Sequence, residues 1–133
     1  MSAGSGYSPN VRAIAQMVMD ENNNENHVMA VNTALTSAHN GKFIVVPDTA
    51  VALVTLTLPD PDDVGDGFIA TYLNRSANGL RLLTSGGASI FVGAYEAASD
   101  WFKTLDVGGC SKFKLVDGAW YGVEAPTGSW VDA

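Results

Sequence analysis

The chain has 133 residues, a length that fits one domain and can bury a core without metal or disulfide staples. Its net charge is −7 and its seven Lys and Arg residues are thinly spread, so we expect binding neither to nucleic acid nor to an anionic membrane. Charged residues make up only 16% of the chain, which suits a protein whose faces are covered by neighbours, although a weakly charged monomer is equally allowed.

The start of the chain lacks the features of a secretion signal. Residues 1–7 are small and Gly-rich, without the basic and apolar regions that such a signal needs. No apolar run approaches the length of about 20 residues that spans a bilayer, and the single cysteine, Cys110, cannot form an intrachain disulfide. We therefore expect synthesis in a reducing cytoplasm, where the glycosylation-like triplet at Asn74 indicates only a turn.

A short amphipathic helix is predicted near the N-terminus. Ser8 and Pro9 provide an N-cap and a first helical residue. Four apolar residues follow at the spacing of one helical face: Val11, Ile14, Ala15 and Val18. The polar tract 20–26 ends the pattern, and a helix of about eleven residues is marginal alone in water. This face therefore needs a partner, which is either the rest of the chain or another subunit.

From Gly41 onward, short apolar runs alternate with turn residues at intervals of roughly ten residues, a pattern typical of strands. The expected strands are Lys42–Val46, Ala52–Leu58, Phe68–Asn74, Leu80–Thr84, Ser89–Val92, Phe102–Val107, Lys112–Val116, Ala119–Val123 and Ser129–Val131. No helix is predicted after Gly41. This spacing predicts an all-β domain, built as a small antiparallel sandwich, a jelly roll or a barrel.

The strongest turn signal is Asp117-Gly118, because both residues tolerate the positive φ angles of a type I′ turn. It predicts a hairpin between Lys112–Val116 and Ala119–Val123, in which Trp120 lies on the face opposite its neighbours. The same alternation divides the run 52–58 into an apolar face and a threonine face.

These differences in composition and hydrophobic pattern divide the chain into an N-terminal anchoring arm, residues 1–34, and a β-domain, residues 35–133. The β-domain has enough apolar residues in its strands to fold alone. The arm carries the short helix and the Asn-rich tract, and we expect it to depend on a partner surface.

The residues that could carry chemistry do not combine into a catalytic or metal site. The acidic loop 60–66 has Asp-x-Asp spacing, but it lacks a closing Glu and contains Pro61, so a solvated turn is favoured over a calcium site. His27 and His39 have neither a strained serine elbow nor a Glu-x-x-His partner. Cys110 has no adjacent cation and is interpreted as a small packed residue. We predict no enzyme activity, no cofactor and no metal.

Aromatic residues concentrate in the last third of the chain. Trp101, Trp120 and Trp130 could form platforms for sugars or flanking subunits. In an all-β domain, however, such residues more often pack in the core or across strands. Both interpretations stay open at the level of the sequence.

Several of these runs resemble small β-domains of tailed-phage virions. The resemblance is carried by the runs Asn40–Val46, Val54–Pro59 and Gly67–Asn74. The closing segments Ser111–Trp120 and Gly128–Trp130 look similar to the way those domains end. Such domains occur in capsid decoration proteins, of the cement or head-fibre type, and in tail-fibre tips.

The resemblance covers most of residues 35–131, and it rests on strand and turn patterns. It implies a structural virion protein, made in the host cytoplasm, that sits on the outer capsid surface and stabilises the shell. The implied partners are the major capsid protein and, in a homotrimer, further copies of the chain. An arm that anchors and a β-domain that projects agree with the division at residue 34.

Two other classes compete with capsid decoration. A tail-fibre or receptor-binding module would recognise host-surface glycans through exposed aromatics such as Trp101, Trp120 or Trp130. A polysaccharide hydrolase is disfavoured, because no paired carboxylates stand out in the β-domain beyond the acidic loop.

Overall fold

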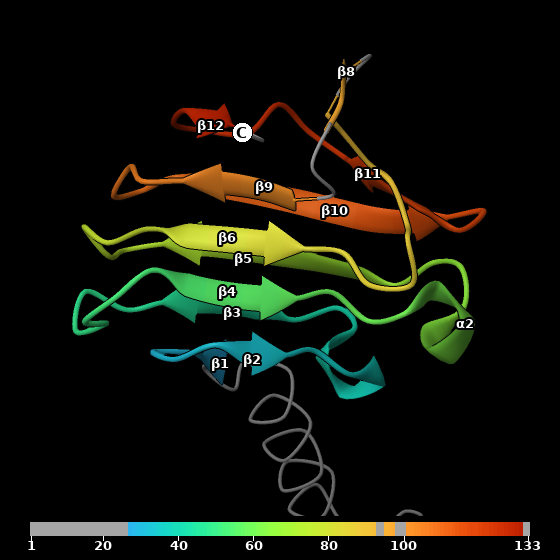
Figure 1. Cartoon of the computed structure of the whole chain (residues 1–133), viewed down its shortest axis with the longest axis horizontal. Helices are drawn as coiled ribbons and strands as arrows, with labels where there is room; N and C mark the ends of the chain where they lie inside the picture. Colours follow the sequence, from blue (N-terminus) through green and yellow to red (C-terminus); the bar gives the residue numbers. More distant parts are fainter. Residues whose placement is uncertain (1–26, 93–94, 98–100, 132–133) are drawn as a thin grey trace, which may run out of the picture.

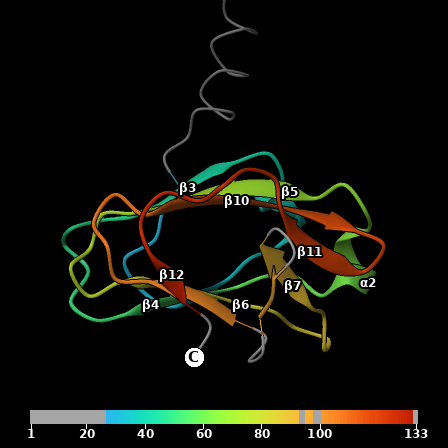
Figure 2. The same ribbon diagram turned by 90° about the horizontal axis from the view of Figure 1, so that it is seen from above.

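The computed structural model describes residues 27–92, 95–97 and 101–131, which form a nearly all-β body of two sheets (Figure 1). Sheet A contains, in spatial order, β1 (His27–Val28), β3 (Phe43–Val46), β5 (Ile69–Asn74), β10 (Cys110–Val116), β11 (Ala119–Gly122), β7 (Ile90–Val92) and β8 (Tyr95–Glu96). Sheet B contains, in spatial order, β12 (Trp130–Val131), β9 (Trp101–Thr104), β6 (Leu80–Leu83), β4 (Val54–Thr57) and β2 (Thr33–Ala34). Seen from above, the two sheets form two facing layers (Figure 2).

The first six strands alternate between the sheets and stack as three coils of a flattened solenoid. In sheet A, β1, β3 and β5 pair in parallel, and in sheet B, β2, β4 and β6 do the same. Each coil gives one strand to each sheet, so the crossover between parallel neighbours is a strand of the other sheet. Figure 1 shows these coils as successive levels of the body.

Antiparallel strands complete the other end of the stack. β9 runs antiparallel to β6, and β10 runs antiparallel to β5. β11 then pairs antiparallel with β10, and β12 pairs antiparallel with β9. The hairpin between β10 and β11 has the predicted turn, with φ of 51° at Asp117 and 79° at Gly118. Both values lie in the left-handed region that a type I′ turn requires.

The all-β prediction is confirmed, but solenoid-like stacking takes the place of the predicted antiparallel sandwich, jelly roll or barrel. The connection 47–53, for example, leads from β3 in sheet A to β4 in sheet B. In the first three coils, consecutive strands therefore face each other across the core instead of forming hairpins. Period-two alternation shows which side chains point inward, and it is the same in both arrangements.

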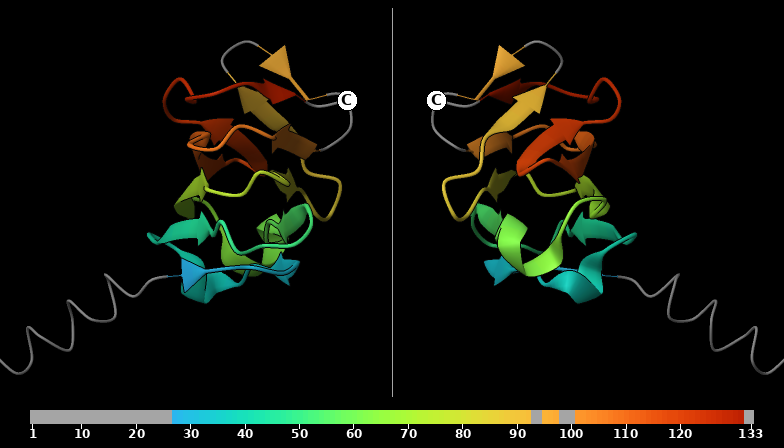
Figure 3. Two further views of the ribbon diagram at one scale, coloured as in Figure 1. Left: turned by 90° about the vertical axis from the view of Figure 1, so that its left-hand side faces the viewer. Right: turned by 90° about the vertical axis from the view of Figure 1, so that its right-hand side faces the viewer.

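Two further details differ from the sequence predictions. Residues 27–34 were assigned to the arm, but they contain β1 and β2. The part of the body that the structure describes therefore begins at His27. The acidic loop contains one helical turn, α2 (Pro61–Val64), in a region where no helix was predicted. Figure 3 shows α2 at one end of the body, facing the viewer in the right-hand view. No helix in the described part of the chain is long and apolar enough to cross a membrane.

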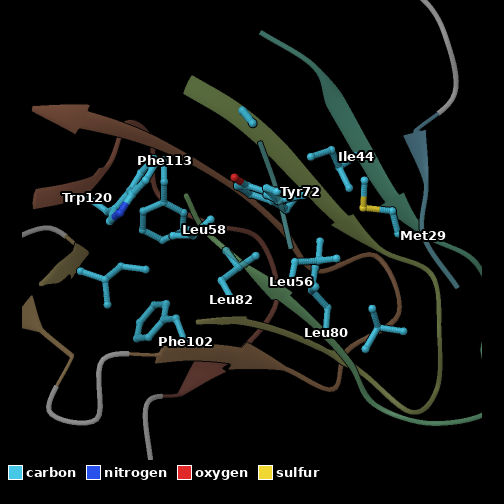
Figure 4. Close-up of a cluster of buried hydrophobic side chains, with 14 of the residues drawn as sticks. Met29, Ile44, Leu56, Leu58, Tyr72, Leu80, Leu82, Phe102, Phe113 and Trp120 are labelled. Atoms are coloured by element: carbon cyan, nitrogen blue, oxygen red, sulfur yellow. The ribbon is translucent and has the colours of Figure 1, made fainter. Parts of the chain in front are cut away.

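The core fills the space between the sheets (Figure 4). Its largest fully buried side chains are Trp120, Tyr72, Phe113, Ile44, Leu56, Leu58, Leu80, Leu82, Ile90, Leu115, Val46 and Val54. Trp120 meets Phe68 edge to face, with ring centroids 5.6 Å apart. Burial of each large apolar side chain contributes about 1.5–3 kcal/mol, so this interlayer core is the main source of stability.

Candidate partner-binding surfaces

The residues predicted to bind a partner through the arm, Val11, Ile14, Ala15 and Val18, lie outside the described residues. The predicted helix and its apolar face therefore stay predictions. What the structure defines is the place where that segment joins the body, at His27 on the first coil.

The first coil has open sheet edges. β1 pairs only with β3, and β2 pairs only with β4, within the part of the chain that the structure describes. Met29 anchors this coil by donating its backbone N–H to the Val45 carbonyl over 2.9 Å, and its side chain is buried. Val28 and Val31 beside it are exposed. Edge strands at the end of a solenoid present unpaired backbone groups that a further chain can extend.

The outer face of sheet A is rich in exposed apolar side chains, and we call it the apolar face. It carries Val28, Phe43, Val116, Tyr121 and Val123, each between 41% and 53% exposed. Single exposed apolar residues are ordinary, whereas several on one sheet face indicate an interaction surface.

Two further features shape the apolar face. The rings of Phe91 and Tyr121 stack with centroids 5.0 Å apart and planes 9° apart. Lys112 and Lys114 emerge between the apolar residues, and the Lys112 ammonium lies 3.7 Å from the Glu124 carboxylate. This exposed ion pair contributes little stability.

A shallow cavity of about 240 Å³ lies on the same face, between Phe43 and Cys110. Burial, with a smaller contribution from Glu124, raises the pKa of the Cys110 thiol. A raised pKa disfavours the thiolate, which is the nucleophilic form. Cys110 is only half-buried and lines this cavity, so its interpretation as a small packed residue stays a prediction.

A second cavity, of about 370 Å³, lies between the first coil and α2. Its lining residues include Thr36, Asp60, Asp63 and Ser85, together with apolar residues such as Leu35 and Val64. Asp60 Oδ1 accepts the Asp62 backbone N–H over 3.0 Å and so caps α2. Asp66, the last residue of the acidic loop, accepts the Asp117 backbone N–H over 2.9 Å. Two of the loop carboxylates thus serve as backbone caps.

The described residues contain no group of three or more His, Cys, Asp or Glu side chains placed to hold a metal ion. The acidic loop forms the helical turn α2, with Asp60 as its N-cap.

The three predicted aromatic contact residues lie in three different settings. Trp120 is fully buried in the core. Trp130 is half-buried, stacks on Phe102 with centroids 6.1 Å apart, and donates its indole N–H to the Thr127 carbonyl over 2.9 Å. Trp101 alone of the three faces outward from the middle of a sheet, on β9 of sheet B. The structure therefore does not combine them into one platform.

Two cations that the sequence analysis did not single out lie beside Trp101. The Arg81 Cζ atom is 5.8 Å from the centre of the Trp101 ring, and the Lys103 Nζ atom is 5.4 Å from it. The available signal was alternation: Trp101 and Lys103 are two residues apart on one strand and so share a face. The neighbouring strand that supplies Arg81 could not be known from the sequence.

Searches of the sequence against protein-family models and against curated proteins find no match.

Proposed function

We propose that the chain is a structural virion protein that binds the outer capsid surface and decorates or stabilises the shell. In this proposal its N-terminal segment anchors it to the major capsid protein and its β-body forms a homotrimer. The observation that carries the proposal is the open first coil, which lies where the N-terminal segment joins the body.

Both ends of the stack expose short edge strands in the described residues, and the first coil is distinguished by its junction with the N-terminal segment. At the far end, antiparallel strands and the β10–β11 hairpin continue the sheets beyond β5 and β6. At the near end, β1 and β2 are two residues long and offer one unpaired edge each in the described residues. Adding a strand of a partner to such an edge satisfies backbone groups and gives affinity without a deep pocket.

The predicted arm adds a second contact next to these edges. Its four apolar residues would bury against a partner only when that partner is assembled into a lattice. A ligand that binds the assembled form and not the free subunits shifts the equilibrium toward the shell by mass action. This is the physical basis of cementing.

The apolar face supports the trimer. Threefold symmetry is closed, so three copies can bury equivalent surfaces without leaving a face free to grow into a filament. Burial of Phe43, Tyr121 and Val123 between copies would remove much of the exposed apolar surface of sheet A.

The anchoring step is tested in the full-length protein with two glutamate substitutions in the predicted helix. Ile14→Glu places a charge on the apolar face, whereas Gln16→Glu adds the same charge off that face. We expect Ile14→Glu to lower co-sedimentation with shells of the phage that encodes the chain at least about tenfold, since burial of an unpaired charge costs several kcal/mol. Gln16→Glu should bind like the wild type.

A truncation complements these substitutions and should remove residues 1–26 only. Met29 and Leu35 are buried, so a cut at residue 34 would damage the body as well as the arm. Equal shell binding by Ile14→Glu and the wild type, or recovery of the protein with tails instead of heads, would contradict the proposal.

A further inference from the structure

The outer face of sheet B carries a cluster of one aromatic and two cationic side chains, which we call the Trp101 site: Trp101, Arg81 and Lys103. β6 and β9 are antiparallel neighbours, and their register places Arg81 directly opposite Lys103. Leu83 is opposite Trp101 in the next position of the same register. The indole therefore lies beside both cations, at the 5.8 Å and 5.4 Å given above.

Like charges directly opposite each other on a sheet face destabilise the pairing of their strands. In the described part of the chain, neither Arg81 nor Lys103 forms an ion pair with a carboxylate. Arg81 donates only from Nε, to the Thr55 hydroxyl over 3.2 Å. The negative face of an indole offsets part of this repulsion, by about 0.5–1 kcal/mol per cation at an exposed site. Among the described residues, no carboxylate contacts the remaining guanidinium donors or the ammonium, so an anion could bind them.

The location of the site selects the kind of anion. β6 is paired on both sides, whereas β9 pairs with β6 along its whole length and with β12 only at Lys103 and Thr104. In the described residues the open edge of β9 is therefore two residues long, too short for an extended acidic peptide to add as a strand. Two cations on a chain of net charge −7 are too few to hold a polyphosphate by release of counterions. A ligand with one carboxylate and an apolar surface fits both limits.

We propose that the Trp101 site binds a carboxylated sugar residue of an acidic glycan. The C–H face of the sugar packs on the indole, and its carboxylate accepts hydrogen bonds from the Arg81 guanidinium and the Lys103 ammonium. Thr57 lies in the same cross-strand row as Leu83 and Trp101, where its hydroxyl can meet a sugar hydroxyl. This inference is independent of the proposed capsid function, because it uses the face of sheet B and neither the arm nor the apolar face.

The test measures binding of trigalacturonate and 3′-sialyllactose to the full-length protein by titration calorimetry. The neutral counterparts trigalactose and lactose are measured in parallel. We expect binding of at least one acidic sugar, weaker binding at high salt, and at least about tenfold weaker binding of the matched neutral sugar, since a charge-assisted hydrogen bond contributes about 1.5–3 kcal/mol.

Variants assign the binding to this site. Trp101→Ala and the double variant Arg81→Gln/Lys103→Gln should each weaken acidic-sugar binding at least about tenfold. Lys114→Gln removes a positive charge from the outer face of sheet A and should leave binding unchanged. Circular dichroism and thermal melting establish that each variant is folded. If the variant with Arg81→Gln does not fold, Arg81→Lys replaces that substitution.

Three outcomes would overturn the proposal. The first is no measurable binding of either acidic sugar by the folded wild type. The second is equal loss in Lys114→Gln and in the Arg81 and Lys103 variant, which would indicate a nonspecific charge effect. The third is tighter, Trp101-dependent binding of a hexaglutamate peptide, which would assign the site to acidic proteins instead.

Discussion

Asn74 shows how one buried polar residue organises the loops at one end of the body. Its side-chain amide donates to the carbonyls of Ser76 and Asp106, each over 2.9 Å, and accepts the Ser76 N–H over 3.0 Å. Asp106 lies in the connection between β9 and β10, so the amide joins two loops that are 32 residues apart. Asn74 is fully buried. The glycosylation-like triplet that begins at Asn74 is therefore a structural turn, in keeping with the sequence interpretation.

Replacement of this amide should be costly. We expect Asn74→Ala to lower the free energy of unfolding by about 2–4 kcal/mol, because it leaves buried backbone groups of both loops without partners. Urea denaturation followed by tryptophan fluorescence measures the change. Arg75→Ala, at the exposed neighbouring position, is the matched control and should change stability by less than about 0.5 kcal/mol. Similar losses in the two variants would contradict the role assigned to Asn74.

His39 makes the stability of the first coil depend on pH. Burial lowers the pKa of His39, and the neighbouring His27, whose ring centroid is 5.5 Å away, lowers this pKa further by charge repulsion. The neutral ring accepts the Thr36 backbone N–H at Nδ1 over 2.9 Å. Because the folded-state pKa lies below the ordinary value of 6.5, the stabilisation is complete above pH 6.5. It is lost as the pH falls through the folded-state pKa.

The expected result is a free energy of unfolding that decreases as the pH is lowered below 6.5. Urea denaturation at a series of pH values measures the slope, and His39→Gln should flatten it, since an amide does not titrate in this range. An unchanged slope in His39→Gln would assign the acid sensitivity to other groups.

At the scale of the element, the sequence predicted the strands best where alternation was regular. β10 alternates Phe113 and Leu115, which are buried, with Lys112 and Lys114 on the outer face. The turn at Asp117-Gly118 identified the partner of β10 as well, because two residues are too few for any connection other than a hairpin. Local chemistry was sufficient in this case.

Local chemistry was insufficient for the first three coils. β3 pairs with β5, and β4 pairs with β6, so the pairing skips one strand each time. The hydrophobic pattern indicates which side chains are buried, but it does not indicate which strand of which sheet lies beside them. β1 and β2 were missed for a related reason: each is two residues long, and their order comes from the neighbours to which they bond.

At the scale of the whole molecule, the candidate surfaces depend on these pairings and so were only partly predictable. Trp101 was proposed as an aromatic contact from its sequence, and it lies on an outer face. Its companions Arg81 and Lys103 converge on it only because β6 and β9 are antiparallel neighbours. Trp120 had the same status in the sequence, yet the alternation of β11 places it in the core.

The stacked coils give the body two broad outer faces with different chemistry. The outer face of sheet B presents hydroxyls, Arg81, Lys103 and Trp101, whereas that of sheet A presents five exposed apolar side chains together with Lys112 and Lys114. An assembly that buries the outer face of sheet A and leaves the outer face of sheet B exposed to solvent would suit the chemistry of both faces. The apolar face is therefore the surface on which a trimer contact is expected.

A charge placed in that face should dissociate the proposed trimer. Phe43, on β3, is 50% exposed, and we expect Phe43→Glu to raise the dissociation constant at least about 100-fold, since an unpaired charge would be buried at the contact. Analytical ultracentrifugation across a concentration series measures the association. Val51→Glu makes a similar change at a 92% exposed loop position and should leave the trimer intact. A wild type that sediments as a monomer at every concentration, or equal dissociation by both variants, would place the contact elsewhere or remove it.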